Sequence, residues 1–235
     1  MPRARSTQYD DWQTAAPHEH GSGCLSLFSM PIMGVFLITC LISAFAAFNT
    51  PTHTSAVSAS VPQTYSVSSP AAVSPIFTRE IQHWAKDIQR WANAAGVDPN
   101  LAATVMQIES CGDPRTTSSA GAMGLFQVMP FHFHTGENGY NPETNALRGM
   151  NYLARSLKAA NGDARLALAG YNGGIGVITR SEWMWPAETK RYVLYGAPIY
   201  SDARNGKTSS VMLDEWYRKY GAGLCRQASR RLGLP

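Results

Sequence analysis

Charged residues are absent from a long stretch of the N-terminal half, and this absence strongly constrains how the chain can fold. No Asp, Glu, Lys or Arg occurs between Gly21 and Thr78, and within that stretch Pro31 to Phe48 is continuously apolar or small. A run of roughly eighteen such residues is long enough to cross a hydrocarbon core of about 30 Å. We therefore expect one transmembrane helix at residues 30–49.

The distribution of basic residues predicts the orientation of this helix. Arg3 and Arg5 precede the apolar run, and no Lys or Arg follows it until Arg79. The positive-inside rule places the short tail of residues 1–29 in the cytoplasm and everything after residue 50 on the other side of the membrane. An uncleaved signal anchor fits best, because about thirty residues ahead of the apolar run are long for a cleaved signal.

Other interpretations of the apolar run stay open. A cleaved signal peptide would use Ala44-Phe45-Ala46 as its small-x-small site, and the C-terminal part would then be secreted. Lipoprotein processing at Cys40 fits less well, because Thr39 is unusual before a modified cysteine and the apolar run continues beyond it. A buried core helix conflicts with the uncharged flank that follows. Every membrane interpretation exports the C-terminal part.

The segment after the apolar run has the composition of a tether. Residues 50–76 are rich in Ser, Thr, Ala, Val and Pro, and they show neither a helical nor a strand period. Such a sequence predicts a flexible linker. The folded domain is then expected to span residues 77–235.

Helical patterns dominate this domain. Apolar residues at three- and four-residue spacing predict an amphipathic helix over residues 78–95, which Gly96 ends. Asp98-Pro99 supplies an N-cap and a first-turn proline for a helix that runs to Glu109. Further helices are expected at residues 145–160, 164–169, 186–192 and 212–231. Strand-like alternation is nearly absent, so the sequence predicts a mainly α domain.

The four cysteines divide by position. Cys24 and Cys40 lie before or within the apolar run and are not expected to pair with the domain. Cys111 and Cys225 lie in the exported part, where an oxidising compartment favours a disulfide between them. The alternative is two unpaired thiols.

Glu109 is the strongest candidate for chemistry. It ends an apolar helical run, and a carboxyl group against apolar neighbours resists ionisation, so it can hold a proton near neutral pH and deliver it to a leaving oxygen. Two glycine-rich segments follow it, Gly121–Gln127 and Gly170–Gly174. This combination indicates a site that cleaves carbohydrate.

Several blocks of the domain share one order with a known family. They are Ile108–Ser110, Ala120–Pro130, Asn141–Leu153, Ala169–Gly174 and Pro186–Val193. In this order they resemble the lytic transglycosylases of the soluble-lytic-transglycosylase type, which are relatives of goose-type lysozyme. The resemblance covers about residues 79–196 and implies a mainly α, lysozyme-like catalytic domain.

The resemblance also implies a reaction. Family members cleave the MurNAc–GlcNAc bond of peptidoglycan without water and without a cofactor. The residue at the position of Glu109 protonates the glycosidic oxygen and then, as a carboxylate, takes a proton from the C6 hydroxyl of the same muramic sugar, which closes on C1 to leave a 1,6-anhydro end. Because this nucleophile is already held in place, a single carboxylate is sufficient, whereas ordinary glycosidases need two.

The same resemblance assigns further residues. The positions expected to contact substrate are Ser110, Gln127, Tyr171 and Asn172. The positions expected to support the site are Gly121, Gly124 and Glu188. Tyrosine can stack on a sugar face and donate a hydrogen bond, and the glycines allow a glycan chain to approach the backbone closely.

Other candidate residues are weaker evidence for a function. His132 and His134 alternate with phenylalanines, but no third ligand stands at metal-site spacing, so no metal is expected. Trp183 and Trp185 are read as core rather than as a sugar-stacking wall. A net charge of +4 is too slight to imply nucleic acid. The expected partners are peptidoglycan strands and the membrane, and the sequence points to no particular protein partner.

Two rival functions remain. A goose-type hydrolase would need a further acid such as Glu137 or Glu182 to activate water, and neither lies in a recognised motif. A catalytically weak peptidoglycan-binding module of a wall-spanning assembly would not need Glu109. The preferred prediction is a transglycosylase held at the bacterial cytoplasmic membrane with its catalytic domain on the extracytoplasmic side.

Overall fold

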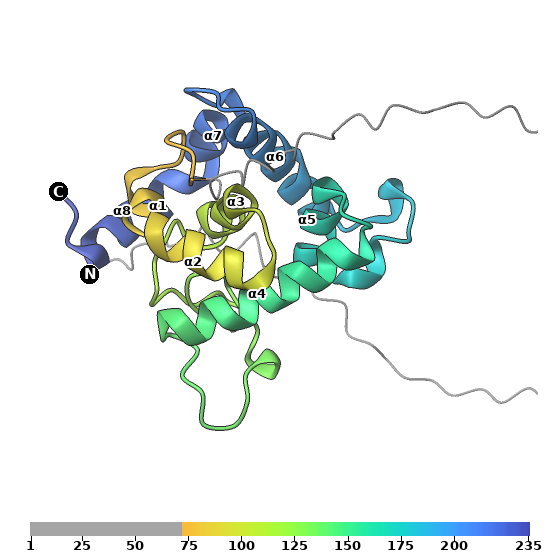
Figure 1. Ribbon diagram of the computed structural model, residues 1–235, viewed down its shortest axis with the longest axis horizontal. Coiled ribbons are helices and arrows are strands. Elements are labelled where there is room, and N and C mark those ends of the chain that lie inside the picture. The colour runs from red at the N-terminus through yellow and green to blue at the C-terminus, as the bar shows by residue number, and fades with distance from the viewer. Residues whose placement is uncertain (1–71) are drawn as a thin grey trace, which may run out of the picture. The chain divides into compact units, whose positions relative to one another are not determined.

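The computed structural model describes residues 72–235, which are built from α-helices and short connecting turns (Figure 1). The predicted tail at residues 1–29, the predicted transmembrane helix at residues 30–49 and most of the predicted linker lie outside the described residues. In the part of the chain that is described, no helix combines the length and the apolar character that a membrane crossing requires. The mainly α prediction for the domain is confirmed.

The first predicted helix is present but interrupted. It consists of α1 (Arg79–His83) and α2 (Ala85–Ala95), which Trp84 separates. The Trp84 indole N–H donates to the carbonyl of Gly112 at 2.9 Å, so this residue is tied to the turn that follows the next helix. Gly96 ends α2 in the left-handed conformation with φ +66°, as its position in the sequence predicted.

Helix α3 (Pro99–Glu109) lies among the other helices and carries the candidate acid at its C-terminal end (Figure 1). Asp98 caps it by accepting from the backbone N–H of Asn100 at 2.8 Å, and Pro99 occupies the first turn. All of its residues are buried, since α1, α2 and α6 pack around it. A helix buried on every side is fixed by its neighbours, and so is the residue that ends it.

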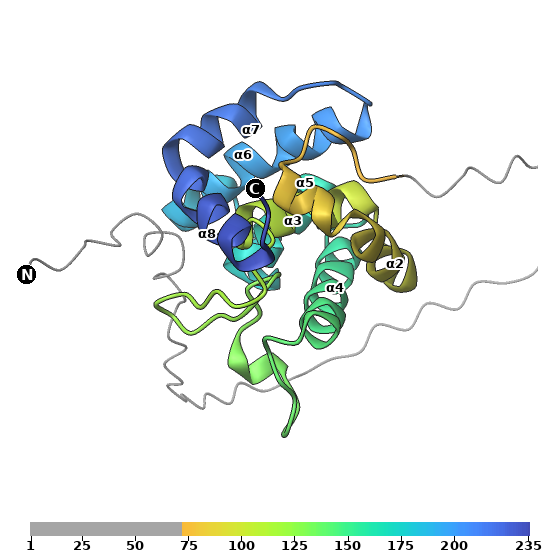
Figure 2. The ribbon, with the colours of Figure 1, turned by 90° about the vertical axis from the view of Figure 1, so that its left-hand side faces the viewer.

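The segment between α3 and α4 contains turns and a short pairing of extended backbone. Isolated antiparallel bridges join Thr117 to Met123 and Met123 to Val128. The 3₁₀-helix η2 (Pro130–His132) follows, and the connection from it to α4 projects from the helices (Figure 2). This segment forms the non-helical side of the domain.

Helices α4 (Pro142–Ala159) and α5 (Ala164–Gly173) are both longer than predicted. Helix α4 begins three residues earlier than residue 145, because the Asn141 side chain caps it by accepting from Thr144 N–H at 3.1 Å. Helix α5 is capped by Asp163 as expected, but it continues through the predicted turn at residues 171–173.

The C-terminal third returns across α3 and α5. After η3 (Ile175–Val177) and η4 (Glu182–Met184), helix α6 (Ala187–Arg204) runs far beyond its predicted end at residue 192. The predicted helix at residues 212–231 consists of α7 (Val211–Trp216), a π-helical turn η5 (Tyr217–Gly221) and α8 (Ala222–Leu232).

The predicted disulfide between Cys111 and Cys225 is confirmed. Their Cα atoms lie 5.0 Å apart, although the two residues are separated by 114 positions in the chain. The bond joins the turn directly after α3 to helix α8. It therefore lies two residues from the candidate acid.

Candidate active site

Glu109 occupies the buried end of α3, with 9% of its surface exposed. Two phenols, Tyr171 from α5 and Tyr192 from α6, lie close enough to experience its charge. Burial raises the pKa of both phenols well above 10, and the negative charge of Glu109 raises it further. Both phenols are therefore protonated at neutral pH, and the Tyr192 hydroxyl is the hydrogen-bond donor to the carboxyl group.

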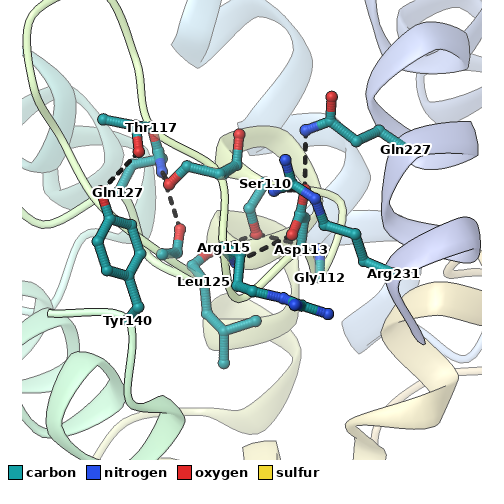
Figure 3. A network of polar contacts seen from close by, with 12 residues as sticks. Ser110, Gly112, Asp113, Arg115, Thr117, Leu125, Gln127, Tyr140, Gln227 and Arg231 are labelled. Atoms are coloured by element: carbon teal, nitrogen blue, oxygen red, sulfur yellow. Dashed lines mark hydrogen bonds and ion pairs between the residues drawn. The ribbon is translucent and has the colours of Figure 1, made fainter. Parts of the chain in front are cut away.

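Ser110 links the end of α3 to the following loop. Its hydroxyl donates to the carbonyl of Leu125 at 2.6 Å and accepts from the backbone N–H of Gly112 at 3.0 Å (Figure 3). The residue is 0% exposed, so the hydroxyl is used within the protein. These two hydrogen bonds fix the end of α3 and therefore the direction in which the Glu109 side chain leaves the helix.

Gln127 ends the glycine-rich loop and is also held from within. Its side-chain amide donates to the carbonyl of Gly124 at 2.9 Å and to that of Thr116 at 3.3 Å. Its backbone has φ +45°, an unusual conformation for a residue with a side chain. The side chain is 7% exposed, so most of it packs against the loop rather than facing solvent.

The two glycines of this loop are required for different reasons. Gly121 and Gly124 both have positive φ, +86° and +72°. A Cβ on Gly124 would lie 2.6 Å from the side-chain nitrogen of Asn145, whereas a Cβ on Gly121 would meet nothing closer than 4.0 Å. Gly124 is therefore also a packing position, and Gly121 leaves the backbone open to an approaching ligand.

Asn145 is a central support of the loop that the sequence did not single out. Its side chain is 0% exposed and makes three hydrogen bonds, accepting from Phe126 N–H at 2.8 Å and donating to the carbonyls of Met123 and Gly139 at 2.7 and 2.8 Å. A polar residue on the buried stripe of a predicted helix was the available signal.

Tyr171 and Asn172 hold the site from α5. The Tyr171 hydroxyl donates to the carbonyl of Phe126 at 2.7 Å, and the Asn172 side-chain carbonyl accepts from the Thr189 hydroxyl at 2.9 Å. Tyr171 thus contacts the glycine-rich loop and lies beside Glu109 at the same time. The structure brings these residues together from distant parts of the chain.

Glu188 lies one helical turn before Tyr192 at the start of α6 and is half-buried. Its charge is among the causes that raise the pKa of Tyr192, after burial and the charge of Glu109. Its carboxylate is therefore a second negative charge near Tyr192.

Two side chains of α8 hold the turn that follows Glu109. The Asp113 carboxylate is 0% exposed and accepts from Arg231 at 2.7 Å and from Gln227 at 2.8 Å (Figure 3). The Cys111–Cys225 disulfide reinforces the same connection. The sequence pointed to the disulfide but gave no reason to expect a buried carboxylate and its ion pair beside it.

The aromatic residues that the sequence assigned to the core differ in their exposure. Trp185 is buried, and its indole N–H donates to the carbonyl of Val177 at 2.9 Å, but Trp183 is 77% exposed. Within the described residues, the one cluster with metal-ligand proximity is Glu80 with Cys111 and Cys225, whose sulfurs are already bonded to each other. Neither His132 nor His134 belongs to it.

Comparison with known proteins finds a family match for the region that contains Glu109 and most of the residues around it. Residues 86–191 match the family described as "Transglycosylase SLT domain". The chain is 39% identical over 111 residues to a protein named "Transglycosylase" of Enterobacteria phage PRD1, an overlap of 46% of this chain and 40% of that protein. It is 29% identical over 131 residues to "Membrane-bound lytic murein transglycosylase D" of Escherichia coli K12, covering 45% of this chain and 28% of that protein.

A solved structure also resembles the chain. It is an inactive mutant of the lytic transglycosylase Slt of Pseudomonas aeruginosa, which is 24% identical with a TM-score of 0.43, covering 57% of this chain and 26% of that chain. The matched region of the present chain therefore spans less than half the length of each of these relatives.

Proposed function

We propose that this chain is a peptidoglycan lytic transglycosylase with Glu109 as its acid and base, because residues 86–191 match the transglycosylase SLT domain. The observation that carries the proposal is the position of Glu109. It ends a fully buried helix inside the matched region, beside two protonated phenols that come from two other helices.

The proposed reaction needs one carboxyl group. Glu109 gives its proton to the glycosidic oxygen as the bond from C1 of the muramic sugar breaks. The resulting carboxylate takes the proton of the C6 hydroxyl of that sugar, and the C6 oxygen bonds to C1. The products are a free hydroxyl on the departing strand and a 1,6-anhydro end, with the acid restored.

The surrounding residues act by holding this geometry. Tyr192 is the donor that stabilises Glu109 while it is a carboxylate, and Tyr171, whose hydroxyl donates to the Phe126 carbonyl, holds the glycine-rich loop beside it. Ser110 orients the acid through the carbonyl of Leu125. Gln127 and Asn172 shape the loop and the helix end that face the sugar, and Gly121 lets a glycan strand approach the backbone.

The positions of the other acids bear on the hydrolase alternative. Glu137 is held by Arg148 at 2.9 and 2.5 Å, and this pairing lowers its pKa to about 2, so it is a poor base for activating water. Glu182 forms an ion pair with Arg165 at 2.5 Å. Glu188 is a further carboxylate to test for a hydrolase, because its charge reaches Tyr192 beside Glu109.

The cellular setting is part of the proposal. The relative from E. coli is named a membrane-bound murein transglycosylase. Together with the apolar run at residues 30–49, this supports a catalytic domain on the extracytoplasmic side of the membrane, retained by an anchor.

Digestion of purified peptidoglycan tests the activity and excludes the binding-module alternative. We expect Glu109→Gln to release soluble fragments at least a thousandfold more slowly than the unmodified chain, because both proton transfers are lost. Asp214→Asn, which removes an exposed charge on α7, is the matched control and is expected to retain activity. Equal rates for Glu109→Gln and the unmodified chain would exclude catalysis by Glu109.

A further inference from the structure

A basic cavity lies beside α4, separate from the groups that the proposed reaction uses. It encloses about 550 Å³. The residues that define its polar and aromatic lining are His132, Arg148, Asn151, Tyr152, Arg155 and Lys158. All but His132 lie on α4, so one exposed face of this helix forms most of the cavity.

Two of the three cations in this cavity form no ion pair with a described residue. Arg148 is neutralised by Glu137 at 2.5 Å. Arg155 and Lys158 are exposed, lie one helical turn apart and form no ion pair with any described residue. The Arg155 guanidinium lies over the Tyr152 ring at 5.8 Å, which orients it while leaving its donors available. The cavity therefore presents net positive charge to a ligand.

A row of aromatic rings connects this cavity to Glu109. Tyr171, beside the acid, contacts Tyr152 with ring centres 5.6 Å apart, and Tyr152 contacts His132 at 4.9 Å. The row ends at Phe131, whose ring lies 4.5 Å from His132 and is 74% exposed. The cavity is thus only one tyrosine away from the ring that touches the reaction site.

We propose that this cavity binds the carboxylates of the peptide stem carried by the glycan strand that Glu109 cleaves. The inference rests on the proposed function. Its physical basis is charge complementarity: in a strand that carries peptides the sugars are neutral, because the lactyl group of each muramic sugar is used in an amide bond, so the carboxylates belong to the peptide. Arg155 and Lys158 supply donors for two carboxylate contacts within reach of the cleaved sugar.

Binding is measured with the full chain carrying Glu109→Gln, so that the ligand stays intact. Three soluble strand preparations of equal length are compared: strands with peptide stems, the same strands with their carboxylates converted to methyl amides, and strands stripped of peptide, which expose the lactyl carboxylate. The double substitution Arg155→Gln with Lys158→Gln is tested against Arg226→Gln with Arg230→Gln, which removes the same charge from exposed positions on α8.

The proposal predicts that the α4 double substitution weakens binding of peptide-bearing strands about fivefold at low salt, as expected for two exposed ion pairs. It predicts no change for the amidated strands and no change with the α8 pair. An equal loss with amidated strands would overturn the proposal, since the cations would then act on something other than carboxylates. An equal loss with stripped strands would assign the site to the sugar's own carboxylate and would also overturn it.

Failure of the proposed reaction would look different. If the unmodified chain released no fragments from peptidoglycan while the α4 cations still discriminated peptide-bearing from amidated strands, the cavity would stand and the catalytic proposal would fall. If cleavage proceeded but the α4 substitutions changed no binding constant, the reverse would hold. The two readouts therefore separate the two proposals.

Discussion

The two segments that flank Glu109 are held by different chemistry. The turn at residues 110–113 is joined to α8 by a disulfide and by an ion pair between the buried Asp113 and the exposed Arg231. The glycine-rich loop at residues 121–128 is held by neutral hydrogen bonds from Asn145 and Tyr171 on α4 and α5. One flank is fixed covalently and by charge, and the other by neutral hydrogen bonds, most of them from the buried Asn145.

From this difference we infer that the two flanks have different roles around Glu109. The covalent flank sets where α3 ends and therefore where the carboxyl group lies. The hydrogen-bonded flank contacts Tyr171, which lies beside Glu109 on the proposed path of the substrate. Losses on the first flank should consequently appear mainly in stability, and losses on the second in both stability and activity.

Reduction of the disulfide is expected to give the largest change in stability. Opening a loop of 114 residues should lower the free energy of unfolding by about 4 kcal/mol, because the unfolded chain regains the entropy of that loop. Urea unfolding with and without a reductant measures this. The variant Cys111→Ala with Cys225→Ala should be insensitive to the reductant; a chain whose stability ignored reduction would refute the contribution of this bond.

Asn145→Ala should have the next largest effect, on the other flank. It removes three buried hydrogen bonds and leaves the Phe126 N–H and two carbonyls without this partner, which is expected to cost about 3 kcal/mol of unfolding free energy. Peptidoglycan cleavage should fall as well, because the loop loses its main support. Full activity together with the expected destabilisation would show that the loop does not position substrate.

The sequence predicted some of the contacts that hold the two flanks of Glu109 in place, but not others. Capping signals at Asp98 and Asp163 correctly placed the starts of α3 and α5, and the position of two cysteines after the apolar run indicated their pairing. Helix caps are local sequence patterns, and disulfide pairing follows from an oxidising compartment, so both can be predicted from a single sequence.

The remaining supports depend on contacts between distant residues. Asp113 has no special local pattern, and the only local signal for Asn145 was its polar side chain on the buried stripe of a predicted helix; the roles of both come from partners across the fold. The continuation of α5 through residues 171–173 also overrode a local turn signal. There the Tyr171 hydroxyl reaches Phe126, and the Thr189 hydroxyl of α6 donates to Asn172, so tertiary packing extends the helix. The candidate acid itself was identified from its position after an apolar run, but its phenolic neighbour Tyr192 was not.

Tyr171→Phe is a smaller and sharper change to the hydrogen-bonded flank. It keeps the ring and removes the donor to the Phe126 carbonyl, which should cost about 1 kcal/mol of stability. Because this hydrogen bond positions the glycine-rich loop beside Glu109, we expect about a tenfold fall in cleavage rate, beyond what the lost stability explains. Thermal melting and fragment release measured on the same sample distinguish these contributions; an unchanged rate would remove Tyr171 from the site.

The smallest expected effect concerns the pairing of Glu137 with Arg148 near the basic cavity. The hydrogen bond from Arg148 lowers the pKa of Glu137 from 4.5 to about 2. The pairing therefore stabilises the fold above about pH 4.5 and is lost as the pH falls toward the folded-state value. Glu137→Gln should reduce the fall in melting temperature between about pH 5 and about pH 3; an identical fall in both proteins would contradict the shift.

The oxygen atom at the new muramic end tests the single-acid mechanism most directly. Peptidoglycan is digested in water labelled with a heavy oxygen isotope, and the fragments are weighed by mass spectrometry alongside those of Glu188→Gln. Closure by the C6 hydroxyl predicts anhydro ends that lack the label in both proteins. The contrary result is reducing ends that carry the label and that disappear in Glu188→Gln. It would show that water is the nucleophile and that two carboxylates take part in catalysis.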